Sequence, residues 1–296
     1  MKHAKRTNIL LRATGCCLLV ACWACSAEMP LGLAAEEGTP VEIVAEIQDV
    51  QQTKAVADYD RTSSFITNDK IRVYRLVNGS RVQQADYTCS GSGSAWTPPS
   101  SNPVTLQAAS EYEAVFPSDY TVIRQDQSAA DGSGYLKSNY LKSGKITSRD
   151  GILRFTDTGA FVHQNVKLTL EFKVQNGGGT DNKPAVDFTN ALLSAPGLLN
   201  GGDGDENITL YRPDANAYLW CGIVYPKNTN TTLNLQLTYQ GVVYKAAVSC
   251  ALAAGTHYRY TLTLKNNILV PEGGTIEGWK TDSDEDYTGE FDKEVS

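Results

Sequence analysis

Residues 166–174 read VKLTLEFKV, and this stretch decides the fold class. Every second residue from Val166 to Val174 is apolar, and the residues between them are polar. Successive side chains of a β-strand point to opposite faces, so this alternation predicts a strand with one buried and one solvent-exposed face. The same pattern returns in residues 233–239 and 258–264.

Shorter or less regular runs of strand-forming residues surround these segments. They are residues 70–77, 111–116, 217–225 and 242–250. Clusters of Gly, Pro, Asn and Ser separate them, and no long helical period appears in the sequence between them. Many short strands joined by turns predict an all-β protein with two tandem antiparallel β-sandwich domains.

We place the domain boundary near residues 160–164, because a new series of strong strands begins at Val166. The polar segment 124–150 contains Gly and Ser throughout and is expected to be a long connection between sheets. The predicted parts are a signal peptide (1–21), a tether (22–40), an N-terminal β-sandwich domain (41–162), a C-terminal β-sandwich domain (163–281) and an acidic tail (282–296).

The N-terminus has the composition of an export signal. A basic start precedes the apolar run 13–21, which is shorter than the roughly 20 residues that a membrane-spanning helix needs. Residues 19–22 (LVAC) resemble the lipobox of bacterial lipoproteins. We therefore expect cleavage before Cys22 and a lipid on its thiol, with Cys25 as the alternative lipid site and an ordinary cleaved signal as the alternative for the whole segment.

The cysteines of the folded body do not form a metal-binding pattern. No Cys-x-x-Cys pair is present among Cys89, Cys221 and Cys250, so zinc or thioredoxin chemistry finds no support. Cys221 and Cys250 lie on apolar strands and could form a disulfide in an oxidising compartment, with buried thiols as the alternative. We predict no metal site and no cofactor.

The sequence contains no recognisable catalytic constellation. Only His163 and His257 follow the signal, and the G-x-S-x-G, H-E-x-x-H and P-loop motifs are missing. The net charge of −7 repels phosphate backbones, so we expect no nucleic-acid partner. Trp96 and Trp220 could form a platform for sugar stacking, with positions in the core as the alternative. A non-enzymatic protein is therefore predicted.

Four groups of motifs, taken in chain order, carry a family resemblance. The first two are QTKA (52–55) and FITNDKIRVY (65–74), in which Asn68 stands where the family usually has a glycine. The third is YEAVFP (112–117) together with FVH (161–163) and VKL (166–168). The fourth is GTHYRYTLTL (255–264) together with IEGW (276–279). In this order they resemble the fimbrillin-like (Mfa-like) proteins, which are subunits of the fimbriae and pili of anaerobic Gram-negative bacteria. The resemblance covers nearly the whole chain after the signal.

The resemblance implies two domains of transthyretin-like topology in a lipoprotein of the outer membrane, displayed on the cell surface in a fimbrium. It also implies that a trypsin-like protease cuts the chain after its first strand. In this sequence the cut would fall between Lys54 and Ala55, and Arg61 is a second candidate.

The first strand has a pattern that suits such processing. Val41, Ile43, Ala45 and Ile47 lie on one face of the strand and could fill an apolar groove. Removal of the strand would leave unpaired backbone groups beside the groove, to which a strand of another subunit could add.

The C-terminus makes a poor donor strand for such an exchange. In residues 280–296 the apolar residues Tyr287, Phe291 and Val295 are spaced by four rather than by two. This favours an accessory, tip or anchor subunit with a role in adhesion, or a surface lipoprotein that does not polymerise, over a major stalk subunit. The expected partners are other fimbrial subunits, the outer membrane through the lipid, and a host or bacterial surface glycan or protein. The alternative function is a glycan-binding lipoprotein of a polysaccharide-uptake system.

Overall fold

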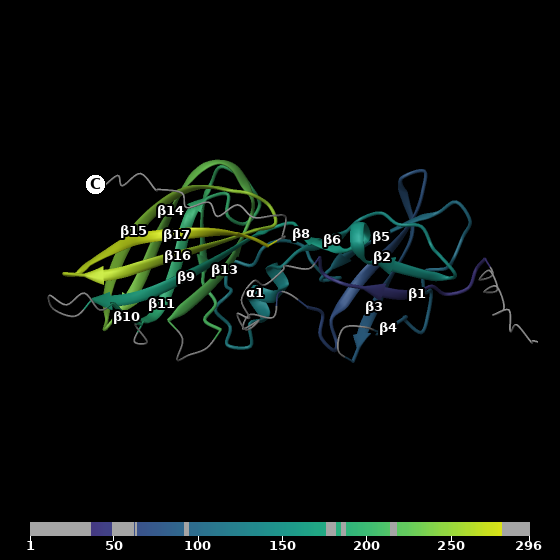
Figure 1. Cartoon of the computed structure of the whole chain (residues 1–296), viewed down its shortest axis with the longest axis horizontal. Coiled ribbons are helices and arrows are strands. Elements are labelled where there is room, and N and C mark those ends of the chain that lie inside the picture. The colour runs from purple at the N-terminus through teal and green to yellow at the C-terminus, as the bar shows by residue number, and fades with distance from the viewer. Residues whose placement is uncertain are drawn as a thin grey trace, which may run out of the picture. The chain divides into compact units, whose positions relative to one another are not determined.

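The computed structural model describes residues 37–48, 62, 64–91, 95–175, 182–184, 188–213 and 218–279. We refer to the described residues up to 163 as the N-terminal region and to those from 164 on as the C-terminal region. Nearly all regular structure in both regions is β (Figure 1). The helices are α1 (Ser133–Ser138) and the short 3₁₀ turn η1 (Asp157–Gly159). Among the described residues, no helix is long and apolar enough to cross a membrane.

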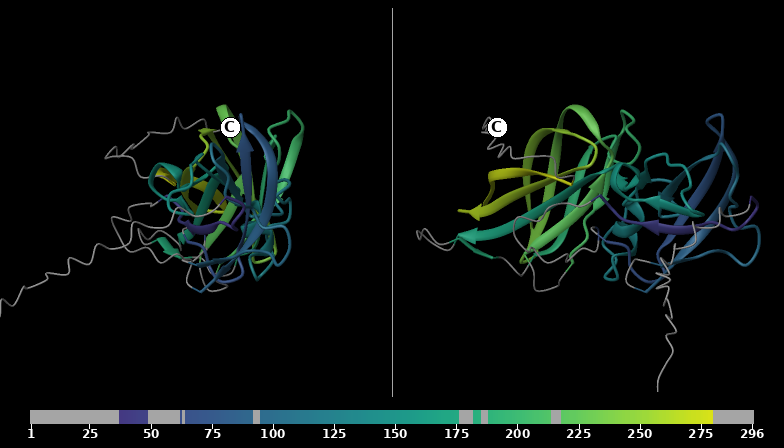
Figure 2. Two further views of the ribbon diagram at one scale, coloured as in Figure 1. Left: turned by 90° about the vertical axis from the view of Figure 1, so that its right-hand side faces the viewer. Right: turned by 45° about the vertical axis from the view of Figure 1, so that its right-hand side comes forward.

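The N-terminal region is built on a six-stranded antiparallel sheet. Its strand order is β4 (Ala95–Thr97), β3 (Ser80–Ser90), β2 (Lys70–Val77), β5 (Glu111–Phe116), β6 (Leu141–Ser143) and β8 (Phe161–His163). A second, two-stranded sheet pairs β1 (Glu42–Ala45) in parallel with β7 (Ile152–Phe155). Figure 2 shows β1 as a purple strand from two further directions.

The C-terminal region contains one five-stranded and one four-stranded sheet. One has the order β10 (Asn182–Pro184), β9 (Val166–Gln175), β16 (Thr256–Lys265) and β17 (Ile268–Gly278), with β13 (Leu219–Val224) also paired with β9. The other has the order β12 (Asp205–Thr209), β11 (Phe188–Pro196), β14 (Lys227–Tyr239) and β15 (Val242–Leu252). All pairs are antiparallel except β9 with β16.

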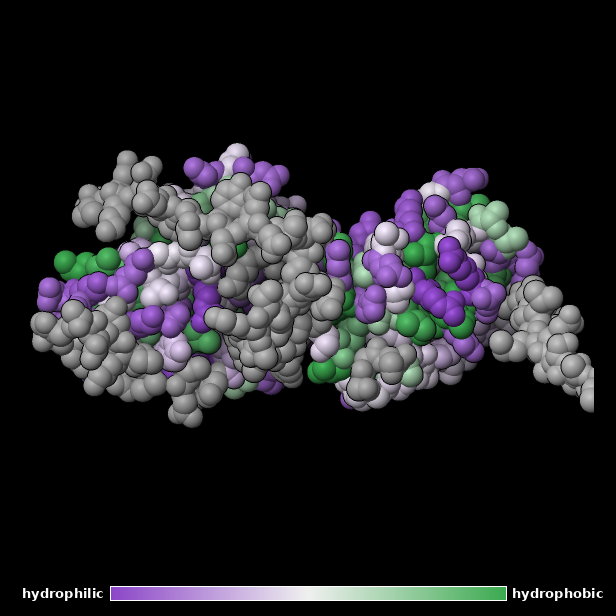
Figure 3. Space-filling view, viewed as in Figure 1, coloured by the Kyte–Doolittle hydropathy of each residue, from purple (hydrophilic) through white to green (hydrophobic). Residues whose placement is uncertain are grey.

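Each region has its own hydrophobic cluster. The inward side chains of both C-terminal sheets meet in one cluster, which includes Leu168 and Leu170 from one sheet and Leu193 and Leu235 from the other. The N-terminal cluster contains side chains between Val41 and Phe161. Hydrophobic residues that stay at the surface are dispersed, and on the face in Figure 3 they are interspersed with hydrophilic ones over the N-terminal region.

The strand positions predicted from the sequence are confirmed. Residues 70–77 and 111–116 are the observed bounds of β2 and β5, and the alternating stretch 166–174 lies within β9. The direction of pairing differs in two places, since β1–β7 and β9–β16 are parallel. Side chains alternate in the same way in parallel and antiparallel strands, so the pattern could not distinguish them.

Segment 124–150 is more structured than a simple connection. It contains α1 and β6, and it forms hydrogen bonds to the C-terminal region. The side-chain amide of Gln127 is fully buried, donating to the Ile223 carbonyl at 2.8 Å and accepting from the Ile223 N–H at 2.9 Å. Just before the segment, Ile123 packs into the C-terminal cluster. The segment therefore fixes its own path by contacts that are remote in sequence.

Candidate assembly site

The first strand presents one apolar face to the N-terminal core. Val41, Ile43, Ala45 and Ile47 have between 2% and 8% of their surface exposed. The residues between them are exposed from Glu42 to Glu46, with Val44 at 40%. The strand therefore has the two distinct faces that its alternating sequence specifies.

The buried face packs against both N-terminal sheets. Its neighbours in the hydrophobic cluster include Leu153 and Phe155 of β7, Phe161 of β8, and Ile71 and Val73 of β2. Phe65, which precedes β2, stacks edge-on against Phe161 with a centroid separation of 5.2 Å. The four side chains of the first strand thus complete a core that is otherwise drawn from residues 65–161.

The backbone of the first strand is bonded along one edge for most of its length. The N–H groups of Glu46 and Gln48 donate to the carbonyls of Phe155 and Phe161 at 3.1 and 2.8 Å. On the opposite edge, the Val41 N–H donates to the Val104 carbonyl at 3.0 Å. Just before Val41, Leu106 is bonded to the same segment, accepting from the Gly38 N–H and donating to the Thr39 carbonyl, both at 2.9 Å. From residue 42 to residue 48, no described residue forms a backbone hydrogen bond with this second edge. From residue 42 to residue 48 the strand is consequently held by its buried side chains and by hydrogen bonds along a single edge.

The lipidation and cleavage residues lie outside the described residues. These are Cys22, Cys25, Lys54, Ala55 and Arg61. Thr62, the residue after Arg61, is buried and accepts a hydrogen bond from the Lys167 ammonium at 3.3 Å.

Cys221 and Cys250 are buried thiols on strands of different sheets. The Cys221 sulfur lies 3.7 Å from the Thr169 hydroxyl. Cys250 lies in the hydrophobic cluster of the C-terminal region, where burial raises the pKa of its thiol. Of the two alternatives left open by the sequence, the structure has the buried thiols and no disulfide between these two residues.

Of the other residues that the sequence singled out, Trp96, Trp220 and His163 are buried and His257 is half-buried. Trp96 and Trp220 are buried, so neither offers a flat surface to a sugar. The ring of His163 lies 3.7 Å from that of Trp279, and its Nδ1 is 2.8 Å from the Asn139 side-chain oxygen. Nε2 of His257 is 2.8 Å from the Thr169 hydroxyl. Nδ1 of His163 and Nε2 of His257 thus each lie within hydrogen-bonding distance of a neutral side chain.

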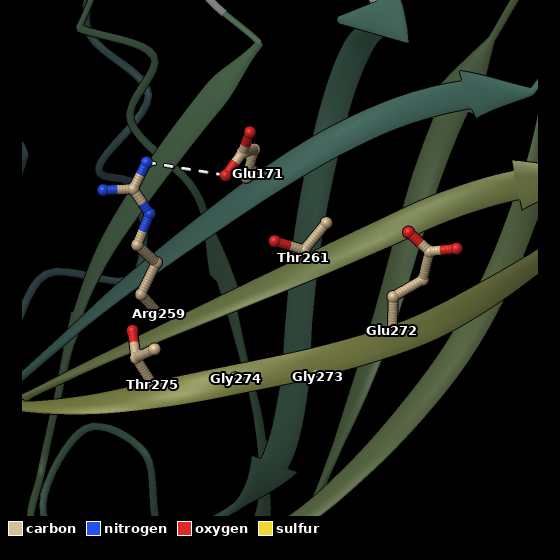
Figure 4. A pocket seen from close by; sticks show the side chains of 7 residues that line it. All are labelled: Glu171, Arg259, Thr261, Glu272, Gly273, Gly274 and Thr275. Atoms are coloured by element: carbon tan, nitrogen blue, oxygen red, sulfur yellow. Dashed lines mark hydrogen bonds and ion pairs between the residues drawn. The ribbon is translucent and has the colours of Figure 1, made fainter. Parts of the chain in front are cut away.

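Two carboxylates, those of Glu171 and Glu272, line a hollow of about 490 Å³ on the sheet of β9, β16 and β17 (Figure 4). Glu171 is 3.5 Å from Arg259 and 3.4 Å from Lys173. Glu272 is paired with Lys265; burial opposes its ionisation, but Lys265 and the Thr263 hydroxyl outweigh burial and lower the pKa of Glu272. A general acid in glycoside hydrolysis needs a raised pKa. The pKa of Glu272 is shifted in the direction opposite to that need.

The family model described as fimbrillin-like matches residues 53–279. The chain belongs to the fimbrillin-like family. This membership supports the role of a structural fimbrial subunit at the cell surface, rather than that of an enzyme. The match begins next to the predicted cleavage point and leaves the first strand outside it.

Solved structures share the fold. A candidate cell adhesion protein from Bacteroides ovatus has a TM-score of 0.60 and 17% identity, over 83% of this chain and 99% of that one. A second, from Bacteroides uniformis, has a TM-score of 0.58 and 18% identity, over 81% of this chain and 98% of that one. At these identities the likeness concerns the fold alone. No curated protein matches the chain.

Proposed function

We propose that the protein is an accessory, tip or anchor subunit of a surface fimbrium, activated by release of its first strand. The observation that carries this proposal is the side-chain burial of Val41, Ile43, Ala45 and Ile47, combined with a backbone bonded mainly along one edge. Such a strand fills a groove of the core and yet can be withdrawn without breaking the six-stranded sheet.

The energetics favour refilling the groove once it is open. Full burial of a Val or Ile side chain is worth roughly 1.5–3 kcal/mol, so three of the four side chains alone contribute several kcal/mol. Cleavage between Lys54 and Ala55, or after Arg61, would convert this internal strand into one that can leave. The vacated groove and the unpaired edge of β7 would then accept an alternating strand from a neighbouring subunit by strand addition.

The proposal includes the route to the cell surface and the domain plan. We propose export as a lipoprotein with its lipid on Cys22, which anchors the chain to the outer membrane until cleavage separates it from the segment that carries Cys22. We also propose two β-sandwich domains, at 41–162 and 163–281. The two largest hydrophobic clusters, one in each region, support this division. Ile123 crosses it, and so does a smaller cluster that joins Tyr135 to Tyr211 and Ile223.

Processing is tested by determining the N-terminus of the protein at the surface of its native cell by mass spectrometry. We expect a form beginning at Ala55 that disappears in Lys54→Ala and persists in the matched control Lys70→Ala, an exposed lysine at the start of β2. A form beginning at Thr62, lost only in Arg61→Ala, would move the cut to Arg61. An intact chain that keeps its lipid on Cys22 would contradict activation by cleavage.

Strand exchange is tested with the cleaved protein and synthetic peptides. A peptide of residues 39–48 should bind the cleaved protein and raise its melting temperature, because it restores the four buried side chains. The same peptide carrying Ile43→Asp should not bind, since it would bury an unpaired carboxylate. Equal binding of both peptides, or binding of the first to the uncleaved protein, would contradict a groove that opens on cleavage.

A further inference from the structure

The outer face of the six-stranded sheet carries a cluster of charged and aromatic residues that the assembly mechanism does not use. At its centre is Glu113 of β5, whose side chain is only 4% exposed. Arg81 reaches it from β3, with Nε and Nη2 donating to the same carboxylate oxygen at 2.8 and 2.6 Å. Lys142 of β6 lies 3.6 Å from the other oxygen. A buried acid thus fixes two cations in place.

The two cations remain largely at the surface while their shared partner does not. The side chains of Arg81 and Lys142 are 47% and 42% exposed. Two positive charges facing solvent around one buried negative charge leave a local positive surplus. The whole chain carries a net charge of −7, so this surplus stands out against the rest of the surface.

Tyrosine rings lie next to these cations. The Arg81 guanidinium stacks on the ring of Tyr74, with 3.7 Å from its central carbon to the ring centroid. Tyr74 lies opposite Glu113 across β2 and β5, and Tyr140 packs against the same small cluster. Arg81 therefore crosses β2 over an aromatic ring before it reaches its carboxylate partner.

A stacked pair of tyrosines extends the cluster. The rings of Tyr120 and Tyr140 are nearly parallel, with centroids 4.4 Å apart, and both are half-buried, so part of each reaches solvent. Burial raises the pKa of both hydroxyls, so they remain protonated at neutral pH and can donate hydrogen bonds. Arg81 and Glu113 lie close enough to Tyr140 to act on its pKa as well.

We infer that this face binds an acidic saccharide, with Arg81 and Lys142 meeting its carboxylates and Tyr120 and Tyr140 meeting its sugar rings. Aromatic faces contact the C–H groups of sugars, and phenol hydroxyls donate to sugar hydroxyls. Cations that are oriented by a buried acid need little reordering to meet an anionic group. A purely acidic peptide would use the cations but not the stacked tyrosines, so the saccharide accounts for more of the arrangement. This site does not depend on strand exchange.

The inference is tested by calorimetric titration of the full-length protein with a galacturonic acid oligomer and with the same oligomer after methyl esterification of its carboxylates. We expect binding of the acidic oligomer that weakens with added salt, and at least about fivefold weaker binding of the ester. Equal affinity for both oligomers would overturn the charged part of the inference. Equal binding of a poly-glutamate peptide would overturn the assignment to a saccharide.

Variants assign the binding to this face. Lys142→Met keeps the length of the side chain, and Tyr140→Ala removes one stacked ring; each should weaken binding by about threefold to fivefold. The matched controls Lys245→Met and Tyr244→Ala lie on β15 and should leave binding unchanged. Unchanged affinity in both test variants would place the ligand elsewhere.

Glu113→Gln is expected to strengthen binding, whereas the other test variants weaken it. It keeps the shape of the side chain and removes the compensating charge, so the acidic oligomer should bind several times more tightly. Thermal unfolding of each variant shows whether it is folded. If Glu113→Gln is unfolded, the inference is tested with Lys142→Met instead, because Arg81 still neutralises Glu113 in the Lys142→Met protein. Weaker binding by a folded Glu113→Gln protein would contradict the inference.

Discussion

Strands β1 and β9 both bury every second side chain as part of an apolar face, and Val44 of β1 is an apolar residue on the exposed face. Their backbones are attached differently. β9 pairs with β16 along one edge and with β10 and β13 along the other. β1 has four paired positions, all with β7, and a short contact at Val41 on its second edge. Two strands with similar side-chain patterns are therefore held by backbone pairing to different extents, β9 along both edges and β1 mainly along one.

Removing a large side chain from β9 should have the largest effect. Phe172 is fully buried and packs against Phe188 of the facing sheet with ring centroids 5.2 Å apart. Phe172→Ala should lower the free energy of unfolding by about 3–5 kcal/mol through the lost burial and the cavity. Urea unfolding followed by tryptophan fluorescence measures this. A loss below that of Ile43→Ala would reverse the ranking of the two strands.

Truncating the buried face of β1 should cost less and depend on processing. Ile43→Ala should lower the free energy of unfolding of the uncleaved protein by about 2–4 kcal/mol. The adjacent control Val44→Ala, at a residue that is 40% exposed, should change it by less than about 0.5 kcal/mol. The same urea titration on the cleaved and released form should show no effect of Ile43→Ala. A persistent effect there would mean that β1 stays bound after cleavage.

The contact between Gln127 and β13, the neighbour of β9, tests how firmly the connecting segment is fixed. Gln127→Ala removes both side-chain hydrogen bonds to Ile223 and leaves its buried N–H and carbonyl without those partners. The expected loss is about 1–3 kcal/mol. Hydrogen exchange should show faster exchange at Ile223 and unchanged exchange in β1. Slower or equal exchange at Ile223 would argue against this role.

The smallest effect expected is a pH dependence in the sheet that contains β9. Lys265 and Thr263 lower the pKa of Glu272 below its ordinary value of 4.5, although burial opposes them. A carboxyl whose pKa is lower in the folded state than in the unfolded state stabilises the fold at pH values above the unfolded-state pKa. This stabilisation is lost as the pH falls through the folded-state pKa. The unfolding free energy should therefore decrease below about pH 4.5, and less steeply in Glu272→Gln. Identical acid profiles for the two proteins would contradict this pairing.

Much of the strand pattern could be predicted, and so could the composition of the first-strand face. The period of two in residues 166–174 and the alternation from Val41 to Ile47 are properties of the chain that need no partner to be recognised. The charged and aromatic face around Glu113 was missed. Its residues come from separate strands and a loop, between positions 74 and 142, and no local motif links them. Only the antiparallel pairing of β2 with β3 and β5, and of β5 with β6, brings them to one face.

The sequence by itself determined where strands form, which side of each strand is apolar, and the family to which the chain belongs, because these follow from the order of neighbouring residues. Tertiary structure alone decided that β9 runs parallel to β16, that Ile123 enters the core of the C-terminal region, and that Cys221 and Cys250 lie in different sheets. It also decided that β1 is bonded mainly along one edge. These features depend on which distant segments pack together, and the free energy of that packing comes from all the buried side chains jointly rather than from any one stretch of sequence.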